Sequence, residues 1–141
     1  VSPFVLNFLG NVNLFHSRIE EDGQAYVGNV AFQLPEKAGS GKKTATFYIR
    51  PHQFQVARVA GGQNSFKAKI KYINPAGATV KLELISEWGG LVQVEVSQEE
   101  YQKLALKKDE DIYVTPKEIS LHAPENNQLD KVWFVKEGGG I

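Results

Sequence analysis

Arg50 and His52 are the residues of this chain whose types and spacing best suit chemistry with an anion. They flank Pro51 at the end of an apolar segment, Thr44 to Ile49, which has the composition of a buried β-strand. Proline removes a hydrogen-bond donor from a strand, so we expect the strand to end here. A guanidinium and an imidazole at the end of a sheet suit anion binding or a contact with another domain. In the alternative interpretation, Arg50 pairs with a carboxylate of its own domain and His52 is merely exposed.

Two glycine-bearing stretches resemble nucleotide-binding motifs, but their surroundings argue against that function. In the stretch 39–44 (GSGKKT), Glu36 stands where a phosphate-binding loop needs its first glycine, and Lys43 replaces the residue that would hold magnesium. The stretch 60–63 (AGGQ) is similar to the core of the ABC ATPase signature, which caps a helix. Here an alternating, strand-like segment, 65–73, follows instead. We therefore expect two surface turns and no ATP site.

Metal and nucleophilic chemistry find no support in the residue pattern. The three histidines, His16, His52 and His122, share no metal-ligand spacing. The chain has no cysteine, which excludes disulfides, thiolate nucleophiles and cysteine zinc sites. Its serines and histidines form no recognisable nucleophile motif. We predict no catalytic residue, no metal site and no cofactor in this chain.

Composition argues against a general affinity for polyanions. The 141 residues include 16 Lys and Arg and 16 Asp and Glu, so the formal net charge at pH 7 is zero. The apolar runs are too short to cross a bilayer, and we expect no secretory signal peptide. Nucleic acid is thus an unlikely partner by composition. However, Lys67, Lys69 and Lys71 alternate with apolar residues that include Phe66, which keeps single-strand binding by base stacking open as an alternative.

Alternation of apolar and polar residues dominates the chain, and turn signals recur about every ten residues. This pattern predicts a mainly β fold, a small OB-like barrel with a short N-terminal helix and one short capping helix. A β-sandwich is the alternative, because the number of strands does not determine how a sheet closes. Residues 132–135 form either a further strand or a packed segment. The other expected extended segments are 12–20, 25–30, 31–34, 44–49, 54–59, 65–73, 79–85, 91–96, 111–115 and 118–121.

The strongest local helix signal begins at Ser97. The stretch 97–100 (SQEE) has the form of a capping box, with serine at the N-cap and glutamate three residues later. We expect a short helix that packs Tyr101 and Leu104 on the barrel and ends by Leu106.

The first ten residues carry a second helix signal. Ser2 suits an N-cap, and Gly10 suits the left-handed conformation that closes a helix. Phe4 and Phe8 give this helix an apolar stripe, but two turns are too short to be stable without docking on a larger body. We therefore predict a docking surface at Phe4 and Phe8. The expected organisation is a linker helix from a missing domain (1–10), a barrel domain (11–122) and a partly disordered C-terminal extension (123–141).

Two motifs carry a resemblance to a known family. The stretch 3–13 (PFVLNFLGNVN) is similar to the segment that joins the nucleotide-binding and regulatory domains in the ATP-binding subunits of sulfate ABC importers. The stretch 47–52 (FYIRPH) resembles a strand of the same family that ends in Arg-Pro. The resemblance covers most of residues 3–121 and implies a TOBE-like, OB-related regulatory domain.

By this resemblance the parent subunit binds ATP and Mg and drives sulfate or thiosulfate import. It would be cytoplasmic, peripheral to the inner face of the plasma membrane through the transporter complex. The resemblance implies a regulatory or accessory role for this chain, with no catalysis of its own. The implied partners are the nucleotide-binding domain of the same subunit, a second copy of that subunit and, indirectly, the membrane permease subunits. Arg50 and His52 would face one of these partners or a sulfate-like anion.

Two alternatives stay open beside this interpretation. A TOBE module can sense a small oxyanion, sulfate or molybdate, although the Ser/Thr-Ser-Arg-Asn type of stretch found in molybdate-binding relatives is absent here. The other alternative is an OB-type binder of single-stranded nucleic acid. A pocket with converging donors would distinguish the sensor, and salt-dependent oligonucleotide affinity would distinguish the nucleic-acid binder.

Overall fold

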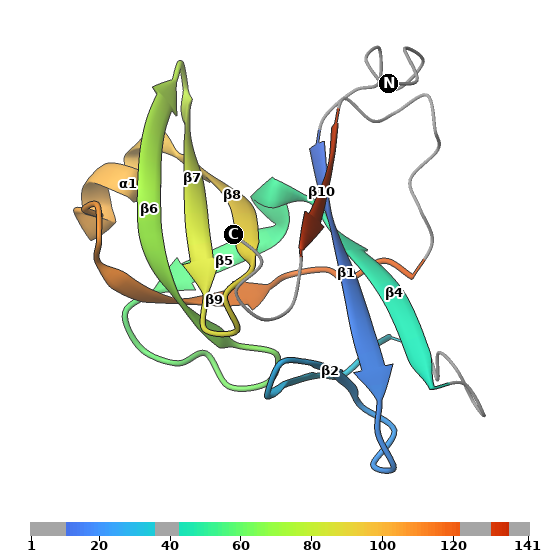
Figure 1. Ribbon diagram of the computed structural model, residues 1–141. Helices are drawn as coiled ribbons and strands as arrows, with labels where there is room; N and C mark the ends of the chain where they lie inside the picture. Colours follow the sequence, from blue (N-terminus) through green and yellow to red (C-terminus); the bar gives the residue numbers. More distant parts are fainter. Residues whose placement is uncertain (1–10, 36–42, 122–130, 136–141) are drawn as a thin grey trace.

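A computed structural model describes residues 11–35, 43–121 and 131–135, whose strands form two five-stranded sheets (Figure 1). The predicted N-terminal helix, the 36–42 loop and most of the predicted C-terminal extension lie outside these residues. The first sheet contains β1 (Asn11–Ile19), β2 (Ala25–Val27), β3 (Val30–Phe32), β4 (Thr44–Ile49) and β10 (Lys131–Val135). The second contains β5 (Phe54–Ala57), β6 (Phe66–Ala76), β7 (Thr79–Ser86), β8 (Leu91–Ser97) and β9 (Asp111–Pro116).

Strand β1 organises the first sheet. It pairs with β4 in antiparallel fashion along one edge, and with β10 in parallel and β2 in antiparallel fashion along the other. The expectation that 132–135 is either a strand or a packed segment thus resolves to a strand. The segments expected from 25 to 34 are interrupted by a turn at Gly28, which separates β2 from β3. Strands of three residues carry too little alternation to reveal such a turn from the pattern alone.

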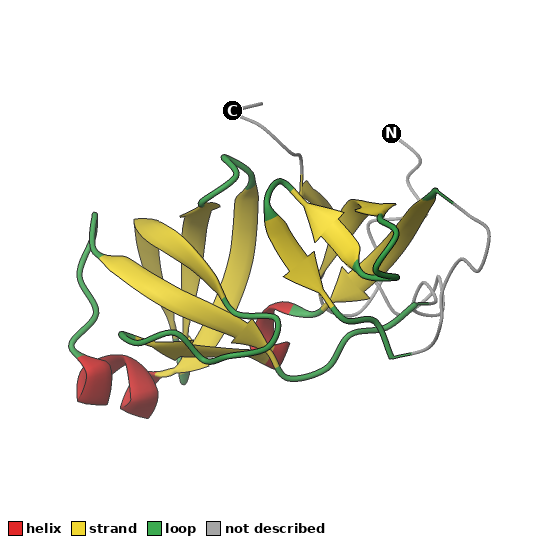
Figure 2. Ribbon diagram, turned by 90° about the horizontal axis from the view of Figure 1, so that it is seen from below, coloured by secondary structure: helices red, strands yellow, loops and turns green. Residues whose placement is uncertain are grey.

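The second sheet is an antiparallel meander in the order β5-β9-β6-β7-β8. A register shift between Ile70 and Tyr72 interrupts the alternation of β6, and Tyr72 is 52% exposed. The predicted mainly β fold is confirmed. Among the described strands, however, no ladder joins the two sheets, so the OB-like barrel is open rather than closed (Figure 2).

One hydrophobic core joins the two sheets, and Trp88 contacts aromatic rings of both. This side chain comes from the turn between β7 and β8 and is 7% exposed. Its ring centroid lies 6.2 Å from those of Phe15 and Phe32 in the first sheet and 4.9 Å from that of Phe66 in the second. Phe15 also stacks on Phe47 with 4.9 Å between centroids. Aromatic contacts therefore hold the sheets together where strand pairing does not.

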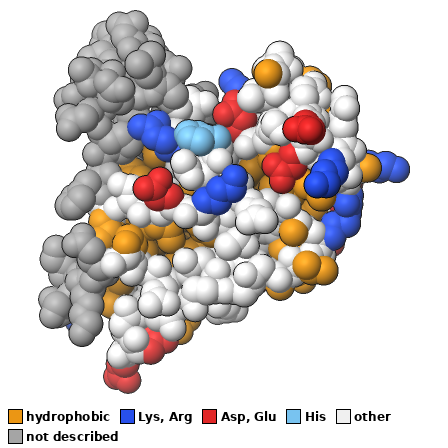
Figure 3. Space-filling view, turned by 180° about the vertical axis from the view of Figure 1, so that it is seen from behind, with side chains coloured by type: hydrophobic (Ala, Val, Ile, Leu, Met, Phe, Trp, Pro, Cys, Tyr) orange, Lys and Arg blue, Asp and Glu red, His pale blue; other side chains and the backbone are white. Residues whose placement is uncertain are grey.

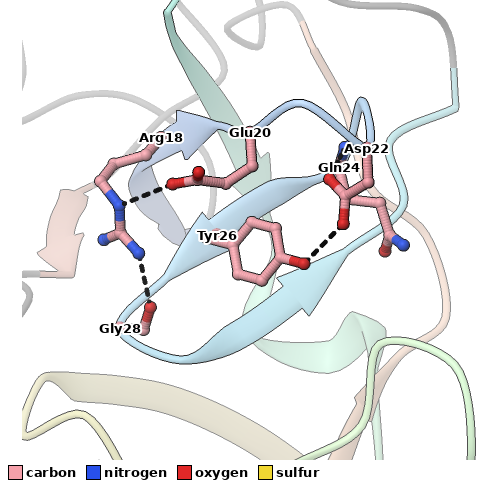
Figure 4. Close-up of polar contacts among 6 residues, drawn as sticks. All are labelled: Arg18, Glu20, Asp22, Gln24, Tyr26 and Gly28. Carbon is pink, nitrogen blue, oxygen red and sulfur yellow. Dashed lines mark hydrogen bonds and ion pairs between the residues drawn. The ribbon is translucent and has the colours of Figure 1, made fainter.

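Polar contacts fix the turn at Gly28 and the hairpin around it (Figure 4). Arg18 Nε lies 3.4 Å from Glu20 Oε2, and Arg18 Nη2 donates to the carbonyl oxygen of Gly28 at 2.8 Å. Nearby, the Tyr26 hydroxyl donates to Asp22 Oδ2 at 2.6 Å. This bond lowers the pKa of the Asp22 carboxyl and raises the pKa of Tyr26, because it stabilises the ionised carboxylate and the protonated phenol. The hairpin is therefore held by side chains as well as by its own ladder.

The predicted helix is α1 (Gln98–Leu104), and its N-cap is confirmed. Ser97 Oγ accepts a hydrogen bond from the Glu100 N–H at 3.0 Å. The helix ends at Ala105, which has the left-handed φ of 53°. Tyr101 and Leu104 pack against the core while remaining half-buried, and the following Leu106 is buried.

Replacing Ser97 by alanine should lower the free energy of unfolding by about 1 kcal/mol, because the Glu100 N–H loses its capping acceptor. Urea denaturation measures the change. Gln102→Ala, at an exposed position of the same helix, is the matched control and should stay within about 0.5 kcal/mol. If the two variants share one denaturation midpoint, the cap does not stabilise the domain.

Candidate functional site

A groove of about 170 Å³ lies where the end of β4 meets strands β7 and β8. The chain leaves β4 at Ile49 and turns through the short 3₁₀-helix η2 (Pro51–Gln53) into β5. Arg50 and His52, the two candidate residues predicted from sequence, both line the groove. The full lining is Asn11, Arg50, Pro51, His52, Lys81, Gln93, Val94 and Glu95. On the face of the molecule shown in Figure 3, a histidine lies among basic and acidic side chains.

Local backbone geometry places Arg50 at this groove. The predicted strand 44–49 is confirmed, and Arg50 follows it in extended conformation. The buried Pro51 begins η2, and the Gln53 N–H donates to the Arg50 carbonyl oxygen at 2.9 Å. Arg50 itself is half-buried, and no hydrogen bond or ion pair joins its guanidinium to another described residue. The alternative interpretation, in which Arg50 pairs with a carboxylate of its own domain, is therefore not supported by the described residues.

Asn13 fixes the strands around the groove. This residue of β1 is fully buried, and its Nδ2 donates to the carbonyl oxygens of Ile49 and Gln93 at 3.1 and 2.8 Å. Its Oδ1 accepts from the Gln93 N–H at 2.9 Å. One side chain thus connects β1 and β4 of the first sheet with β8 of the second. Because Arg50 directly follows Ile49, this bridge sets where the guanidinium lies relative to β8.

Lys81, Gln93 and Glu95 are groove residues that the sequence prediction missed. Lys81 on β7 is exposed and stands opposite Glu95 on β8 in the strand register. The Glu95 Oε2 atom accepts a hydrogen bond from Thr79 Oγ1 at 3.2 Å. Gln93 is 8% exposed. The alternation of both strands shows that these side chains share one sheet face, but no sequence signal shows that Arg50 approaches that face.

Several other predictions concern residues that are not among the described residues lining the groove. Phe4, Phe8 and His122 lie outside the described residues, so the docking surface at Phe4 and Phe8 stays a prediction. Lys69 belongs to a solvated face, where its Nζ lies 3.3 Å from Asp111 Oδ1. Within the described ranges, no group of three or more acidic or histidine side chains is arranged to hold a metal ion. No helix in the same ranges is long and apolar enough to span a membrane.

Arg50→Ala should change the free energy of unfolding by no more than about 0.5 kcal/mol, as expected for a side chain that has no partner among the described residues. Thermal denaturation of the chain provides the measurement. A loss of roughly 3 to 5 kcal/mol would instead indicate a broken buried ion pair and would make Arg50 a structural residue.

Two family models match successive parts of the chain. The model described as the CysA C-terminal regulatory domain matches residues 13–56, which contain most of β1, all of β2 to β4, and Arg50. The model described as a TOBE-like domain matches residues 60–117, which contain β6 to β9 and α1. The boundary between the two matches falls at the end of β5, before the chain reaches β6.

Curated relatives match over nearly the whole chain. The sulfate/thiosulfate import ATP-binding protein CysA of Bacillus cereus is 34% identical over 126 residues, covering 89% of this chain and 35% of the relative. The protein of the same name from Halalkalibacterium halodurans is 35% identical over 130 residues, covering 88% of this chain and 35% of the relative. The chain therefore spans about a third of the length of these relatives.

Among solved structures, the cytoplasmic molybdate-binding protein ModG has a similar fold. The TM-score is 0.59 at 15% sequence identity, and the alignment covers 78% of this chain and 96% of ModG. At that identity the likeness concerns the fold alone, and it agrees with the OB-like arrangement of strands. The two family models and the curated relatives lead to one assignment: this chain belongs to the family of CysA C-terminal regulatory domains and contains their TOBE-like module.

Proposed function

We propose that this chain is the regulatory region of the ATP-hydrolysing subunit of a sulfate or thiosulfate import system, without catalysis of its own. One observation carries the proposal: a regulatory-domain match and a TOBE-like match follow each other along a chain that aligns over 89% of its length with a sulfate/thiosulfate import ATP-binding protein. The remaining part of such a subunit would bind ATP and Mg.

The described fold supports the proposal that this region does not bind ATP and that a separate domain of the subunit does. The stretch 60–63, which is similar to the ABC signature, leads into strand β6 at Phe66 and not into a helix. A helix N-terminus, whose free N–H groups bind phosphate in nucleotide sites, is therefore missing at this position. The stretch 39–44 lies mostly outside the described residues and stays excluded by its sequence alone.

In this proposal the partners are the nucleotide-binding domain of the same subunit, a second copy of the subunit and, through them, the permease. The location would be cytoplasmic, at the inner face of the plasma membrane. Arg50 and His52 at the groove, and Phe4 and Phe8 before it in the chain, are the proposed contact residues. The Asn13 bridge supports such a role, because it fixes Ile49, the residue before Arg50, relative to β8, so that a partner would meet the groove in one defined geometry.

Calorimetric titration of the chain with Mg·ATP tests the absence of a nucleotide site. We expect no binding and no release of phosphate, because the described turns carry no phosphate cradle. Lys42→Ala serves as the matched variant, since Lys42 is the residue that would contact phosphate in the P-loop-like stretch. Magnesium-dependent binding at micromolar Kd that Lys42→Ala abolishes would overturn the proposal of a purely regulatory region.

A further inference from the structure

A second hollow, open to solvent and about 500 Å³ in volume, lies at the loop 105–110, which leads from the end of α1 to β9. Figure 1 shows this loop running beside β6. The residues that line the hollow include Arg58, Leu104, Lys107, Lys108 and Glu110. None of them lines the groove at Arg50, so the hollow is a separate surface.

Arg58 and Glu110 hold the loop in place. The Arg58 guanidinium pairs with the Glu110 carboxylate, and its Nη2 donates to the carbonyl oxygen of Ala105 at 3.3 Å. The other carboxylate oxygen of Glu110, Oε1, accepts from the Lys107 N–H at 3.0 Å. One ion pair thus connects the end of α1 to the start of β9.

The backbone of the same loop has an unusual and well-supported conformation. Ala105 and Asp109 have left-handed φ values of 53° and 69°, which are unfavourable for residues with a Cβ atom and persist only where the surroundings impose them. The Asp109 N–H donates to the Ile70 carbonyl oxygen of β6 at 2.6 Å. The loop is therefore held in one shape, and a partner that binds it need not order it first.

Lysine side chains give this surface positive charge that is not neutralised. Lys71, Lys107 and Lys108 form no ion pair within 4.0 Å in the part of the chain that the structure describes. Arg58, by contrast, already has its carboxylate partner. The exposed Asp109 carboxylate leaves the surface with three positive charges against one negative charge. Because the whole chain has no net charge, this excess is local.

Exposed apolar side chains lie at the same place. Among the described residues, the exposed large hydrophobic side chains are Val59, at 72%, and Tyr72, at 52%. Val59 directly follows Arg58 in the chain, and the Tyr72 ring centroid lies 5.7 Å from Lys108 Nζ and 5.9 Å from Lys71 Nζ. Exposed apolar groups with charged groups around them are typical of protein interaction sites.

We propose that the hollow and the adjoining Tyr72 ring form a docking surface for an acidic segment of another protein. Carboxylates of that segment pair with Lys71, Lys107 and Lys108, and an apolar side chain packs on Tyr72. This inference goes beyond the proposed function and does not depend on it.

Charge complementarity favours an acidic protein segment over a nucleic acid. Glu83 stands opposite Tyr72 in the strand register, and Asp109 lies beside Lys108 in the loop. Both carboxylates would repel a continuous phosphate backbone, whereas the carboxylates of a folded or extended protein segment can be spaced to avoid them.

Titration of the chain with a peptide in which glutamates surround one phenylalanine, followed by NMR amide shifts, tests the proposal. We expect saturable shifts at Tyr72 and in the loop 105–110, and weaker binding as the NaCl concentration rises. Lys107→Glu and Lys108→Glu should each raise the peptide Kd about fivefold, because each replaces an attraction by a repulsion. Lys43→Glu makes the same charge change at an exposed position before β4, and this matched control should change the Kd less than about twofold.

Tyr72→Ala separates the contribution of the ring from that of the charges. This variant should raise the peptide Kd about threefold or more while the salt dependence stays the same. Thermal denaturation of each variant shows that it is folded.

Three results would each overturn the proposal: equal affinity for a peptide with glutamine in place of every glutamate, an effect of Lys43→Glu as large as that of Lys107→Glu, or no saturable shifts at millimolar peptide. Tighter binding of a single-stranded oligothymidylate than of the peptide would assign the surface to nucleic acid and would overturn it as well. None of these results would touch the importer proposal, which depends on sulfate uptake by a hybrid subunit.

Discussion

Asn13→Leu should lower the free energy of unfolding by about 3 kcal/mol or more, one of the two largest effects expected in this chain. Leucine is of similar size but forms none of the three hydrogen bonds that Asn13 makes to Ile49 and Gln93. The buried Gln93 N–H and carbonyl then lose their partner on β1, and each unsatisfied buried group costs about 1 to 3 kcal/mol. Urea denaturation followed by circular dichroism measures the loss.

Asn74→Leu provides the control for the amide-to-alkyl change. Asn74 is also a strand residue, but it is exposed, and its replacement should stay within about 0.5 kcal/mol. If Asn13→Leu shifts the midpoint no more than Asn74→Leu, at unchanged slope, the bridge between the sheets does not stabilise the fold.

Gly28→Ala should be comparably destabilising, because alanine is unfavourable in the left-handed backbone conformation of this position and its Cβ atom would collide with Trp88. The φ of Gly28 is +61°, and a Cβ atom built there would lie 2.5 Å from Trp88 Cβ. Left-handed conformation costs a non-glycine residue about 1 to 2 kcal/mol, and overpacking of a core about 1 to 3 kcal/mol more. We expect a total near 3 kcal/mol in thermal or urea denaturation.

Gly23→Ala separates the two contributions to this loss. Gly23 has a φ of +81°, and nothing lies within 4 Å of the Cβ built there. Its variant should therefore lose only the backbone contribution, about 1 to 2 kcal/mol. Equal losses in the two variants would mean that the close approach between Gly28 and Trp88 does not matter to stability.

The sequence predicts best those features that depend on neighbouring residues. The N-cap at Ser97 and the end of β4 before Pro51 follow from local chemistry, and both are found. The Gly28 turn was missed because the strands on either side have three residues each. The sequence leaves the division into two sheets open between a barrel and a β-sandwich, since strand pattern alone does not determine how a sheet closes.

The sequence predicts only some of the residues that line the groove. Arg50 and His52 stand out beside Pro51, but Lys81 and Gln93 look like ordinary members of alternating strands. What brings them together is the Asn13 bridge, which joins positions 80 residues apart in the chain. The sequence does not show which residues a buried asparagine in a strand will bond. This part of the site is therefore visible only in the three-dimensional structure.

Sulfate uptake by a hybrid subunit tests the central claim most directly. In the hybrid, this chain replaces the part of the Bacillus cereus relative that it matches, about a third of that protein. Cells that lack their own import ATPase and carry the hybrid should take up labelled sulfate at a rate comparable to cells carrying the unaltered relative, and Asn13→Leu in the hybrid should reduce that uptake. A hybrid that is folded and present at the normal level but supports no sulfate uptake would contradict the account.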